Sequence, residues 1–326
     1  MLSAGIDWQA GTWKIALWDE ARAADLHAFA RVSHLWEFLE ETRLVSAAIP
    51  IVLPSGFGIP VTRARDLLDR DIREIALESL SAGPESLGNF LAEARRRIPM
   101  AFCIPAVKLL PTLPLLRKRN RFDLGTADML CIAAWVFHSL ERTGRDCAAL
   151  AFLLMDVGSA GRALLAVQAG RITDGIGRTT PGLGRPALND AQTLLAARGF
   201  ELRRARESRR HEEEPIAFWE GMAKESHALL AYHGLPEAVI TGEWHREAAA
   251  ALGGCLPCAA LLVPGEGYES ALGAAVLAAG LTGGPPPGSW IGWVCARRAT
   301  ECWTGLRHNP DPAPSGAQTR KSRERS

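Results

Sequence analysis

The chain has 326 residues, of which 48% are hydrophobic and 22% are charged, and its formal net charge is +1. A chain of this length is too long for one ordinary hydrophobic core, so it indicates two domains, and its composition is that of a globular protein. The small net charge excludes a strong field that would draw the chain to nucleic acid or to an anionic membrane, and we expect neither partner.

The N-terminus has no signal-peptide pattern, and the apolar stretches are too short for a membrane-spanning helix, so we expect a cytoplasmic protein. The seven cysteines are an odd number and most of them lie in apolar runs, which is typical of reduced thiols. Cys255 and Cys258 form one CxxC motif. Without a second such motif, two packed thiols are favoured over zinc or redox chemistry.

The first half of the chain predicts strands and helices in alternation. Ser3–Trp8 and Thr12–Asp19 are β-prone runs joined by a short turn, which is typical of a β-hairpin. The other elements expected here are strands at Ala24–Val32, Ile49–Leu53 and Met100–Cys103, and helices at Leu35–Leu44, Glu85–Arg97 and Thr126–Arg142. Pro105–Phe122 carries prolines and a basic cluster and is predicted to be a loop.

The opening pattern returns in the second half. The predicted strands are Leu150–Met155, Arg162–Gln168, Arg171–Ile176 and Ala238–Thr241, and the predicted helices are Ala187–Arg198, Ile216–His233, Trp244–Leu252 and Tyr268–Ala279. From His308 the chain is rich in Pro, Ser and Arg and has no apolar period, so we expect it to be disordered.

The two hairpins correspond to each other. Asp7 and Asp156 each end the first strand, a small glycine-containing turn follows, and a basic residue comes next, Lys14 in one copy and Arg162 in the other. This spacing fits one copy in each of two domains. We therefore predict an N-terminal domain at residues 1–148, a C-terminal domain at 149–294 and a tail at 295–326.

Such turns are suited to binding phosphate. Small residues let backbone N–H groups approach an anion closely, and an Asp at a strand end can hold hydrated Mg²⁺ through water. The candidate residues for a nucleotide's phosphates are Asp7, Gly11, Thr12 and Lys14 in the first turn, and Asp156, Gly158, Ser159 and Gly161 in the second. Asp7 and Asp156 are the candidate metal residues.

This pair of turns resembles the phosphate motifs of the actin-like ATPase superfamily, which includes sugar kinases, acetate kinase, Hsp70 and actin. The resemblance implies an α/β fold of two ribonuclease-H-like lobes with a nucleotide cleft between them, and ATP and Mg²⁺ as cofactors. The superfamily usually has Gly two residues after the first Asp, where this chain has Gln9.

Longer segments resemble one family within this superfamily, whose members carry domain-of-unknown-function labels and sometimes a butyrate-kinase label. The resemblance covers about Ser3 to Gly284 and is carried by "LPTLPLLRKRNRFDLGTADMLCIAAW", "MDVGSAGRALLAVQAGRITDGIG" and "GYESALGAAVLAAGLTGG".

Asp128 is the candidate catalytic residue, together with Lys14. It starts a long helix in "GTADML", where the chain is similar to type III pantothenate kinases, and that similarity implies that Asp128 accepts a proton from an acceptor hydroxyl or orients it. A first-turn Asp that complements the helix dipole is the alternative. If the acceptor is a carboxylate, no base is needed and Asp128 only positions groups.

Two further sets of residues are candidates for ligand binding. "AVITGEW" resembles the superfamily's adenosine motif, which implies that Gly242 and Glu243 contact the nucleotide, although a strand-to-helix turn explains them equally well. The candidate acceptor residues are a basic cluster and a turn after a strand: Arg117, Asn120, Arg121, Ser55 and Gly56. An exposed basic loop and ordinary turn chemistry are the alternatives.

We therefore expect an ATP-dependent phosphotransferase, a kinase, that acts on a small, anionic acceptor such as a carboxylate. The carboxylate rests only on the label of the relatives. The alternative is an ATP-binding or ATPase switch of the actin and Hsp70 type without a small-molecule acceptor. Carbamoyl transfer is less favoured, since the chain has no evident metal-binding His pair. A homodimer is left open.

Overall fold

The computed structural model describes residues 2–9, 11–22, 24–45, 49–76, 83–159, 161–178 and 214–282. The helix predicted at 187–198 and the tail at 295–326, with its predicted disorder, lie outside these residues. Within the described ranges, no helix has both the length and the apolar character that crossing a membrane requires.

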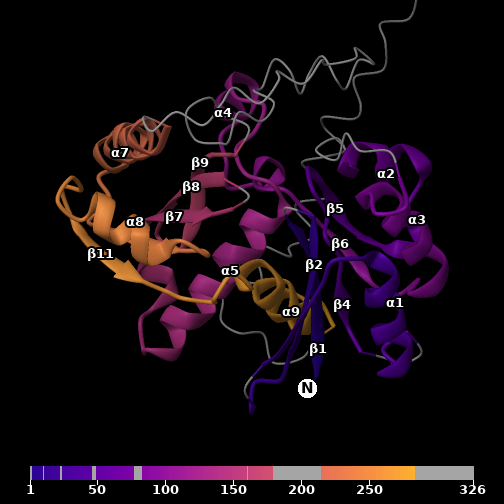
Figure 1. Ribbon diagram of the computed structural model, residues 1–326. Helices are drawn as coiled ribbons and strands as arrows, with labels where there is room; N and C mark the ends of the chain where they lie inside the picture. Colours follow the sequence, from indigo (N-terminus) through magenta and orange to yellow (C-terminus); the bar gives the residue numbers. More distant parts are fainter. Residues whose placement is uncertain are drawn as a thin grey trace, which may run out of the picture.

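Two β-sheets form the framework of the molecule (Figure 1). The first has the strand order β3-β2-β1-β4-β6-β5, with β1 at Ser3–Gln9, β2 at Thr12–Trp18, β3 at Asp25–Phe29, β4 at Ile51–Val52, β5 at Gly58–Arg63 and β6 at Phe102–Pro105. The second has the order β11-β10-β7-β8-β9, with β7 at Phe152–Gly158, β8 at Gly161–Gln168, β9 at Arg171–Ile176, β10 at Glu237–Thr241 and β11 at Ala259–Leu262.

The two sheets repeat one topology. β1 pairs antiparallel with β2 and parallel with β4, and β7 pairs antiparallel with β8 and parallel with β10. The order β3-β2-β1-β4-β6 therefore returns as β9-β8-β7-β10-β11, and β5 is an addition to the first sheet. The predicted duplicated α/β fold with two lobes is confirmed. The predicted domain bounds, at residues 148 and 294, stay a prediction.

The helices divide into outer and inner layers. They are α1 at Val32–Glu41, α2 at Asp69–Ile75, α3 at Leu87–Arg97, α4 at Leu115–Asn120, α5 at Ala127–Arg142, α7 at Glu214–His233, α8 at His245–Leu252 and α9 at Glu269–Leu281. One core joins α1 and α3 to the first sheet, and another joins α7 and α8 to the second. A third core holds α5 and α9 between the inner faces of both sheets, as Figure 1 shows.

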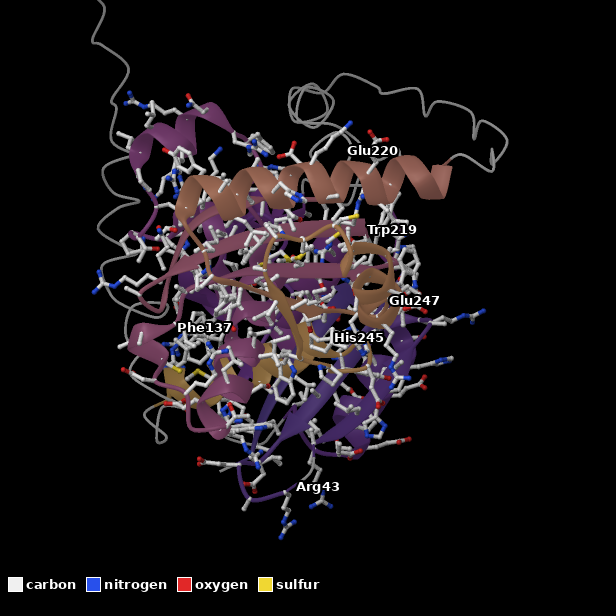
Figure 2. The ribbon with its side chains drawn as sticks, turned by 90° about the vertical axis from the view of Figure 1, so that its left-hand side faces the viewer. Arg43, Phe137, Trp219, Glu220, His245 and Glu247 are labelled. Carbon is white, nitrogen blue, oxygen red and sulfur yellow. The ribbon has the colours of Figure 1, made fainter. Side chains whose placement is uncertain are left out.

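The inner core is closely packed. Phe137 of α5 lies 5.9 Å, centroid to centroid, from Phe152 at the start of β7. Figure 2 shows Phe137 within the molecule, and His245 and Glu247 on α8 with α7 above them. Because both lobes bury apolar side chains against the same two helices, α5 and α9 fix the position of one sheet relative to the other.

One sequence prediction about local structure is wrong. Pro105–Phe122, predicted to be a loop, contains α4 and a short 3-10 helix at Val107–Leu109. Its prolines do not oppose α4, because Pro105 and Pro111 lie before the helix and Pro114 is its N-cap residue, where a missing N–H costs nothing. The sequence patterns also missed α2, β5 and β11.

Glycines allow α9 to approach its neighbours closely. A Cβ atom on Gly5 of β1 would lie 2.1 Å from the carbonyl oxygen of Ala271, and one on Gly273 would lie 1.7 Å from the carbonyl oxygen of Cys131 in α5. Both contacts are with backbone, which cannot move aside as a flexible side chain can. The positions of β1, α5 and α9 therefore depend on these two glycines.

We predict that Gly273→Ala destabilises the fold by about 1–3 kcal/mol, because the added methyl group overpacks the crossing of α5 and α9. Urea unfolding followed by circular dichroism measures this loss. Gly254→Ala is the matched control, since a Cβ atom there meets nothing within 4 Å. Equal stability of the two variants would contradict the packing described.

Candidate functional site between the lobes

Asp7 lies on the inner part of β1 and only 3% of it is exposed. Its Oδ2 atom is buried and has no hydrogen-bond partner. Burial raises the pKa of Asp7 to about 6, with a contribution from the charge of Asp128, although a hydrogen bond from Ser270 and the charges of Lys14 and Arg178 oppose the shift. The protein alone therefore compensates this carboxylate only in part.

Asp156 has the equivalent position on β7 and is 4% exposed. Its Oδ2 atom accepts a hydrogen bond from Nη2 of Arg178 at 2.5 Å. Burial nevertheless raises the pKa of Asp156 to about 6; Arg178 opposes this shift, while the charges of Glu269 and Asp128 add to it. The two hairpins thus each bring one buried, poorly solvated carboxylate to the space between the lobes.

Arg178, just after β9, connects the two halves of the site. Its Nη1 atom forms an ion pair with Oδ2 of Asp128, while its Nη2 atom forms the ion pair with Asp156. The side chain is only 9% exposed. A planar guanidinium group suits two carboxylates at once, because its donors point in fixed directions. Asp7, Asp128, Asp156 and Arg178 therefore form one electrostatic cluster, which we call the inter-lobe cluster.

Asp128 is in the first turn of α5. Its Oδ1 atom accepts a hydrogen bond from the hydroxyl of Thr126, which is the N-cap residue but makes no side-chain cap bond to the backbone. Burial alone would raise the pKa of Asp128, but Arg178, Thr126 and the N–H of Met129 together hold it below its ordinary value. Asp128 is thus an ionised carboxylate and not merely a helix cap.

The N-terminus of α9 forms one wall of the site. The carboxylate of Glu269 is buried and accepts hydrogen bonds from the N–H groups of Gly242 at 3.2 Å and of Gly265 at 3.0 Å. Gly242 has a φ of 96°, and a Cβ atom there would lie 2.7 Å from Oδ1 of Asp156. The predicted nucleotide residue Gly242 therefore lies directly against the second hairpin.

The second turn has an acidic neighbour. Gly158 pairs with Gly161, whose φ is 118°, and the N–H of Ser159 donates a hydrogen bond to Oε2 of Glu243 at 3.0 Å. The structure thus brings Glu243 next to the predicted phosphate-binding turn. That hydrogen bond must break before the N–H of Ser159 can donate to a phosphate oxygen.

At the first turn, Gly11 has a φ of 81° and precedes Thr12, the first residue of β2. Lys14 is directly opposite Asp7 in the ladder, and its Nζ atom donates to the carbonyl of Gly267 at 2.5 Å. Lys14 therefore ties the first hairpin to the loop before α9.

Arg162 is not the counterpart of Lys14. In the β7–β8 ladder Asp156 faces Ala163, whereas Arg162 faces Val157. Because neighbouring residues of a strand point to opposite faces, Arg162 points away from the cleft; its guanidinium group lies 3.4 Å from the ring centroid of Phe218 on α7. Burial lowers its pKa to about 9. The arginine of the site is Arg178 instead.

The predicted acceptor residues on α4 and at its C-cap have separate environments. Arg117 forms an ion pair with Asp174 of β9 at 3.3 Å and a hydrogen bond to the carbonyl of Thr173, so it joins α4 to the second lobe. Asn120 is exposed. Arg121 has a buried Nη1 atom without a hydrogen-bond partner. Contact of Asn120 and Arg121 with an acceptor stays a prediction.

Ser55 and Gly56 are accounted for by backbone contacts. The Ser55 hydroxyl donates to the carbonyl of Leu53 at 2.9 Å and accepts from the N–H of Ile104 at 3.1 Å. Gly56 has a φ of 44°, and its carbonyl accepts from the N–H of Ala127 at 2.8 Å. These bonds hold the start of α5 against the first sheet and need no ligand.

Sequence reasoning missed three residues of this site, Arg178, Glu269 and Ser270. Arg178 follows β9 and Glu269 begins α9, and neither lies in a recognisable motif, so only the folded structure shows that the charges of both act on Asp156. One signal was available: Tyr268–Ala279 was predicted as a helix, and Glu269 is the one carboxylate in its first turn.

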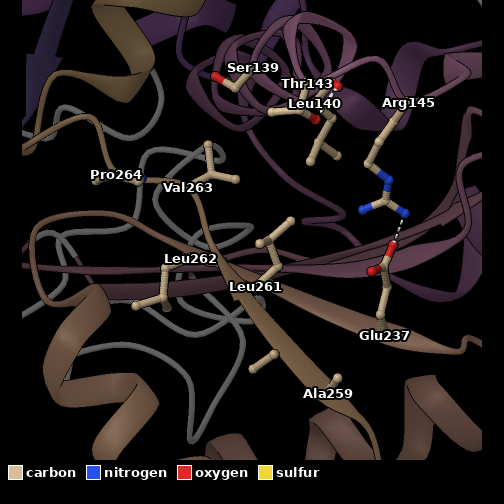
Figure 3. Close-up of a pocket in the computed structure, with 11 residues that line it drawn as sticks. Ser139, Leu140, Thr143, Arg145, Glu237, Ala259, Leu261, Leu262, Val263 and Pro264 are labelled. Atoms are coloured by element: carbon tan, nitrogen blue, oxygen red, sulfur yellow. Dashed lines mark hydrogen bonds and ion pairs between the residues drawn. The ribbon is translucent and has the colours of Figure 1, made fainter.

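A pocket lies outside the inter-lobe cluster, near the opposite end of α5 from Asp128. It has a volume of about 620 Å³ and is situated between β11 and the end of α5, where Arg145 forms an ion pair with Glu237 (Figure 3). None of the predicted site residues lines it. The pocket is therefore separate from the buried carboxylates and the arginine of the inter-lobe cluster.

Comparison with solved structures supports the fold. Acetate kinase from Entamoeba histolytica aligns with a TM-score of 0.52 at 11% identity, covering 83% of this chain and 97% of that one. Lower TM-scores of 0.43 are found for an inorganic polyphosphate/ATP-glucomannokinase from Arthrobacter sp. strain KM, at 12% identity over 85% and 98% of the two chains, and for a ROK family glucokinase from Streptomyces griseus, at 10% identity over 85% and 99%.

The two-lobed fold with its duplicated hairpins is that of the actin-like ATPases. The chain belongs to the DUF1464 family, described as a protein of unknown function, which it matches over residues 5–197. No curated protein has a matching sequence.

Proposed function

We propose that this protein is an ATP-dependent phosphotransferase acting on a small, anionic acceptor such as a carboxylate. The observation that carries the proposal is the inter-lobe cluster, in which Arg178 joins Asp156 to Asp128 while Asp7 lies within electrostatic reach. Phosphoryl transfer needs positioning and charge neutralisation more than covalent chemistry. A clamp of paired turns, one from each lobe, supplies both.

The residues present fit a hydrated Mg²⁺ ion. The buried Oδ2 atom of Asp7 has no hydrogen-bond partner, and burial raises the pKa of Asp7. Both observations are expected of a carboxylate that binds a cation absent from the protein itself. Among the described residues, no group of three or more His, Cys, Asp or Glu side chains could hold a metal. Asp7 and Asp156 would therefore hold the ion through water. When bound, Mg²⁺ neutralises charge on the phosphates.

The residues of the chain divide the remaining work. Lys14, the turn N–H groups and Arg178 would neutralise the phosphates, and Gly242 would let the nucleotide approach the backbone. Asp128 has a lowered pKa beside Arg178, which makes it a weak general base at neutral pH. A weak base is sufficient for an acceptor that has no proton to lose.

The test is ADP release with a panel of acids and alcohols. We predict that acids stimulate release, and that Asp128→Asn lowers the acid-stimulated rate only about tenfold, because Asp128 positions groups and removes no proton. Asp156→Ala should abolish turnover and weaken nucleotide binding. Stimulation by alcohols alone, together with a loss of more than a thousandfold in Asp128→Asn, would show that Asp128 is a base.

An ATP-dependent switch without an acceptor is the second candidate. The hydrogen bond from Ser159 to Glu243 favours it, because it places a carboxylate on a phosphate-binding donor, and Gln9 replaces a usual glycine in the first turn. ATP turnover that no acid or alcohol stimulates would support the switch.

A further inference from the structure

Within the described residues, the second sheet has no counterpart of β5. In the first sheet β5 pairs antiparallel with β6 and forms one outer edge. The equivalent of β6 in the second sheet is β11, because β11 pairs parallel with β10 as β6 pairs parallel with β4. β11 is therefore an edge strand in this part of the chain, and the repeated topology has six strands in one sheet and five in the other.

The exposure of β11 is that of an uncovered strand. All four residues of β6 are buried, whereas all four residues of β11 are exposed, with Leu261 and Leu262 at 39% and 40%. The N–H of Val263 donates to the carbonyl of Ile240 in β10 at 3.1 Å. Because alternate residues of a parallel strand bond to opposite neighbours, Ala260 and Leu262 direct their N–H and C=O groups to the outer edge. An apolar edge of this kind is suited to pairing with another strand.

The pocket of Figure 3 lies beside this edge, between β11 and α5. Its apolar lining includes Leu140 of α5 and, from β11 and the residues after it, Leu261, Leu262, Val263 and Pro264. At about 30 Å³ for each water-sized group, its volume of about 620 Å³ has room for about twenty non-hydrogen atoms. A strand that paired with β11 would direct alternate side chains toward α5, where the pocket can take a large apolar one.

The chain leaves α9 at the end of the molecule where this pocket lies. α5 and α9 both begin at the inter-lobe cluster, with Asp128 and Glu269 in their first turns. Gly273 of α9 packs against Cys131 of α5, and residues along both helices share the inner core. The two helices therefore run side by side in the same direction. Because the last turn of α5 lines the pocket and α9 ends at Leu281, the segment after α9 starts at the same end.

The segment after α9 has the composition of a linker followed by a strand. Residues 283–288 are all glycine or proline, which is typical of a connection. Residues 290–294 read Trp-Ile-Gly-Trp-Val, and aromatic and β-branched residues favour strands. Six linker residues span up to about 20 Å, and a strand of the length of β11 measures about 13 Å. The linker is therefore long enough for residues 290–294 to reach either end of β11.

We propose that residues 290–294 form a sixth strand of the second sheet by pairing with the outer edge of β11, in the place that β5 has in the first sheet. Trp290 and Trp293 are an odd number of residues apart, so one of them enters the pocket and the other lies on the opposite face. β11 leads into the loop in which the N–H of Gly265 donates to Glu269. The added strand thus also supports one wall of the inter-lobe cluster.

The test is hydrogen exchange of the amide groups of Ala260 and Leu262, measured by NMR on the full-length protein. Pairing is expected to slow their exchange at least a hundredfold relative to an unprotected amide. Ile291→Pro and Gly292→Pro are made separately, because one of two neighbouring N–H groups faces β11. At least one of these variants should lower the protection tenfold or more. Ala317→Pro, in the tail, is the control and should leave it unchanged. Unprotected exchange of both amides in the unmodified protein would overturn the proposal.

A proline in β11 itself gives a second measurement. The N–H of Ala260 faces the outer edge, where proline is tolerated if the strand is unpaired on that side. If residues 290–294 pair there, Ala260→Pro removes a hydrogen bond and is expected to lower the melting temperature by about 2–4 °C. It should add little to the effect of the proline at 291 or 292 that breaks the pairing, since both remove the same contact. An unchanged melting temperature would show that the edge is open.

A second copy of the chain is the other candidate for this edge. Protection of Ala260 and Leu262 that increases with protein concentration, together with a dimer in sedimentation equilibrium, would assign the edge to that copy and overturn the proposal. Protection in a monomer that neither Ile291→Pro nor Gly292→Pro changes would also overturn it, because another part of the chain would then cover β11. Loss of protection in a monomeric variant would support it.

Discussion

Replacing Arg178 with alanine is expected to lower kcat/KM for phosphotransfer about a thousandfold, as removal of a positioned cation from a developing phosphoryl charge does in other enzymes. The physical reason is its position, because a single guanidinium group is paired with Asp128 and Asp156 from the two halves of the site. Steady-state ADP release with a stimulating acid measures the effect.

Alanine at this position also leaves two buried carboxylates without their common partner, which costs about 3–5 kcal/mol of stability. Arg178→Lys is therefore a necessary companion variant. Lysine keeps the positive charge but lacks the two Nη donors that pair with Asp128 and Asp156. We therefore expect this variant to fold and to lose about a hundredfold in kcat, with a smaller change in nucleotide affinity. Arg171→Ala, at the exposed first residue of β9, the strand that precedes Arg178, is the control. Activity of Arg178→Lys within threefold of the unmodified protein would remove Arg178 from the mechanism.

Asp7→Asn is expected to stabilise the nucleotide-free protein by about 2–3 kcal/mol at pH 7.5 while lowering turnover at least a hundredfold. Burial, with the charge of Asp128, raises the pKa of Asp7 from 3.8 to about 6 in the folded state. The folded state therefore holds this proton more tightly than the unfolded chain does. Ionised Asp7 costs stability above pH 6 at about 1.4 kcal/mol for each pKa unit, and asparagine removes that cost.

The pH dependence provides the sharp test. Below pH 3.8 the side chain is neutral in both states, so the advantage of Asp7→Asn should decline as the pH falls from 6 toward 3.8. Asp128→Asn is the control with the opposite sign: Asp128 has a lowered pKa beside Arg178, so its neutralisation should destabilise the protein at pH 7.5. Urea unfolding at pH 7.5 and 4.5 measures both variants. A pH-independent effect of Asp7→Asn would mean that packing, not charge, is responsible.

The sequence predicted the parts of this molecule that depend on local patterns. Alternating apolar strands, glycine turns and the repeated Asp7 and Asp156 were sufficient to predict the duplicated lobes, because hairpins and strand ends are determined within a few residues. The helices α5, α7, α8 and α9 were also recognised from their apolar spacing.

The sequence could not show contacts that depend on how elements are arranged in space. Arg178 reaches Asp128 across 50 residues, and Glu269 reaches Gly242 across 27. Arg162 was paired with Lys14 because both follow an aspartate, but the strand register, which alternates faces at each residue, turns it outward. Roles for Ser55 and Gly56 were assigned from turn composition alone, which does not distinguish a ligand-binding turn from one that supports a helix.

The packing of α9 against β1 has a consequence for synthesis of the protein. The hydroxyl of Ser3 donates to the carbonyl of Ala275 at 2.8 Å, so β1 bonds to a helix that is synthesised 272 residues later. Until α9 emerges, the inner surface of the first sheet lacks its cover. A nascent chain or a fragment that stops before Glu269 would expose apolar residues of β1 and β2, and it would need a chaperone or aggregate.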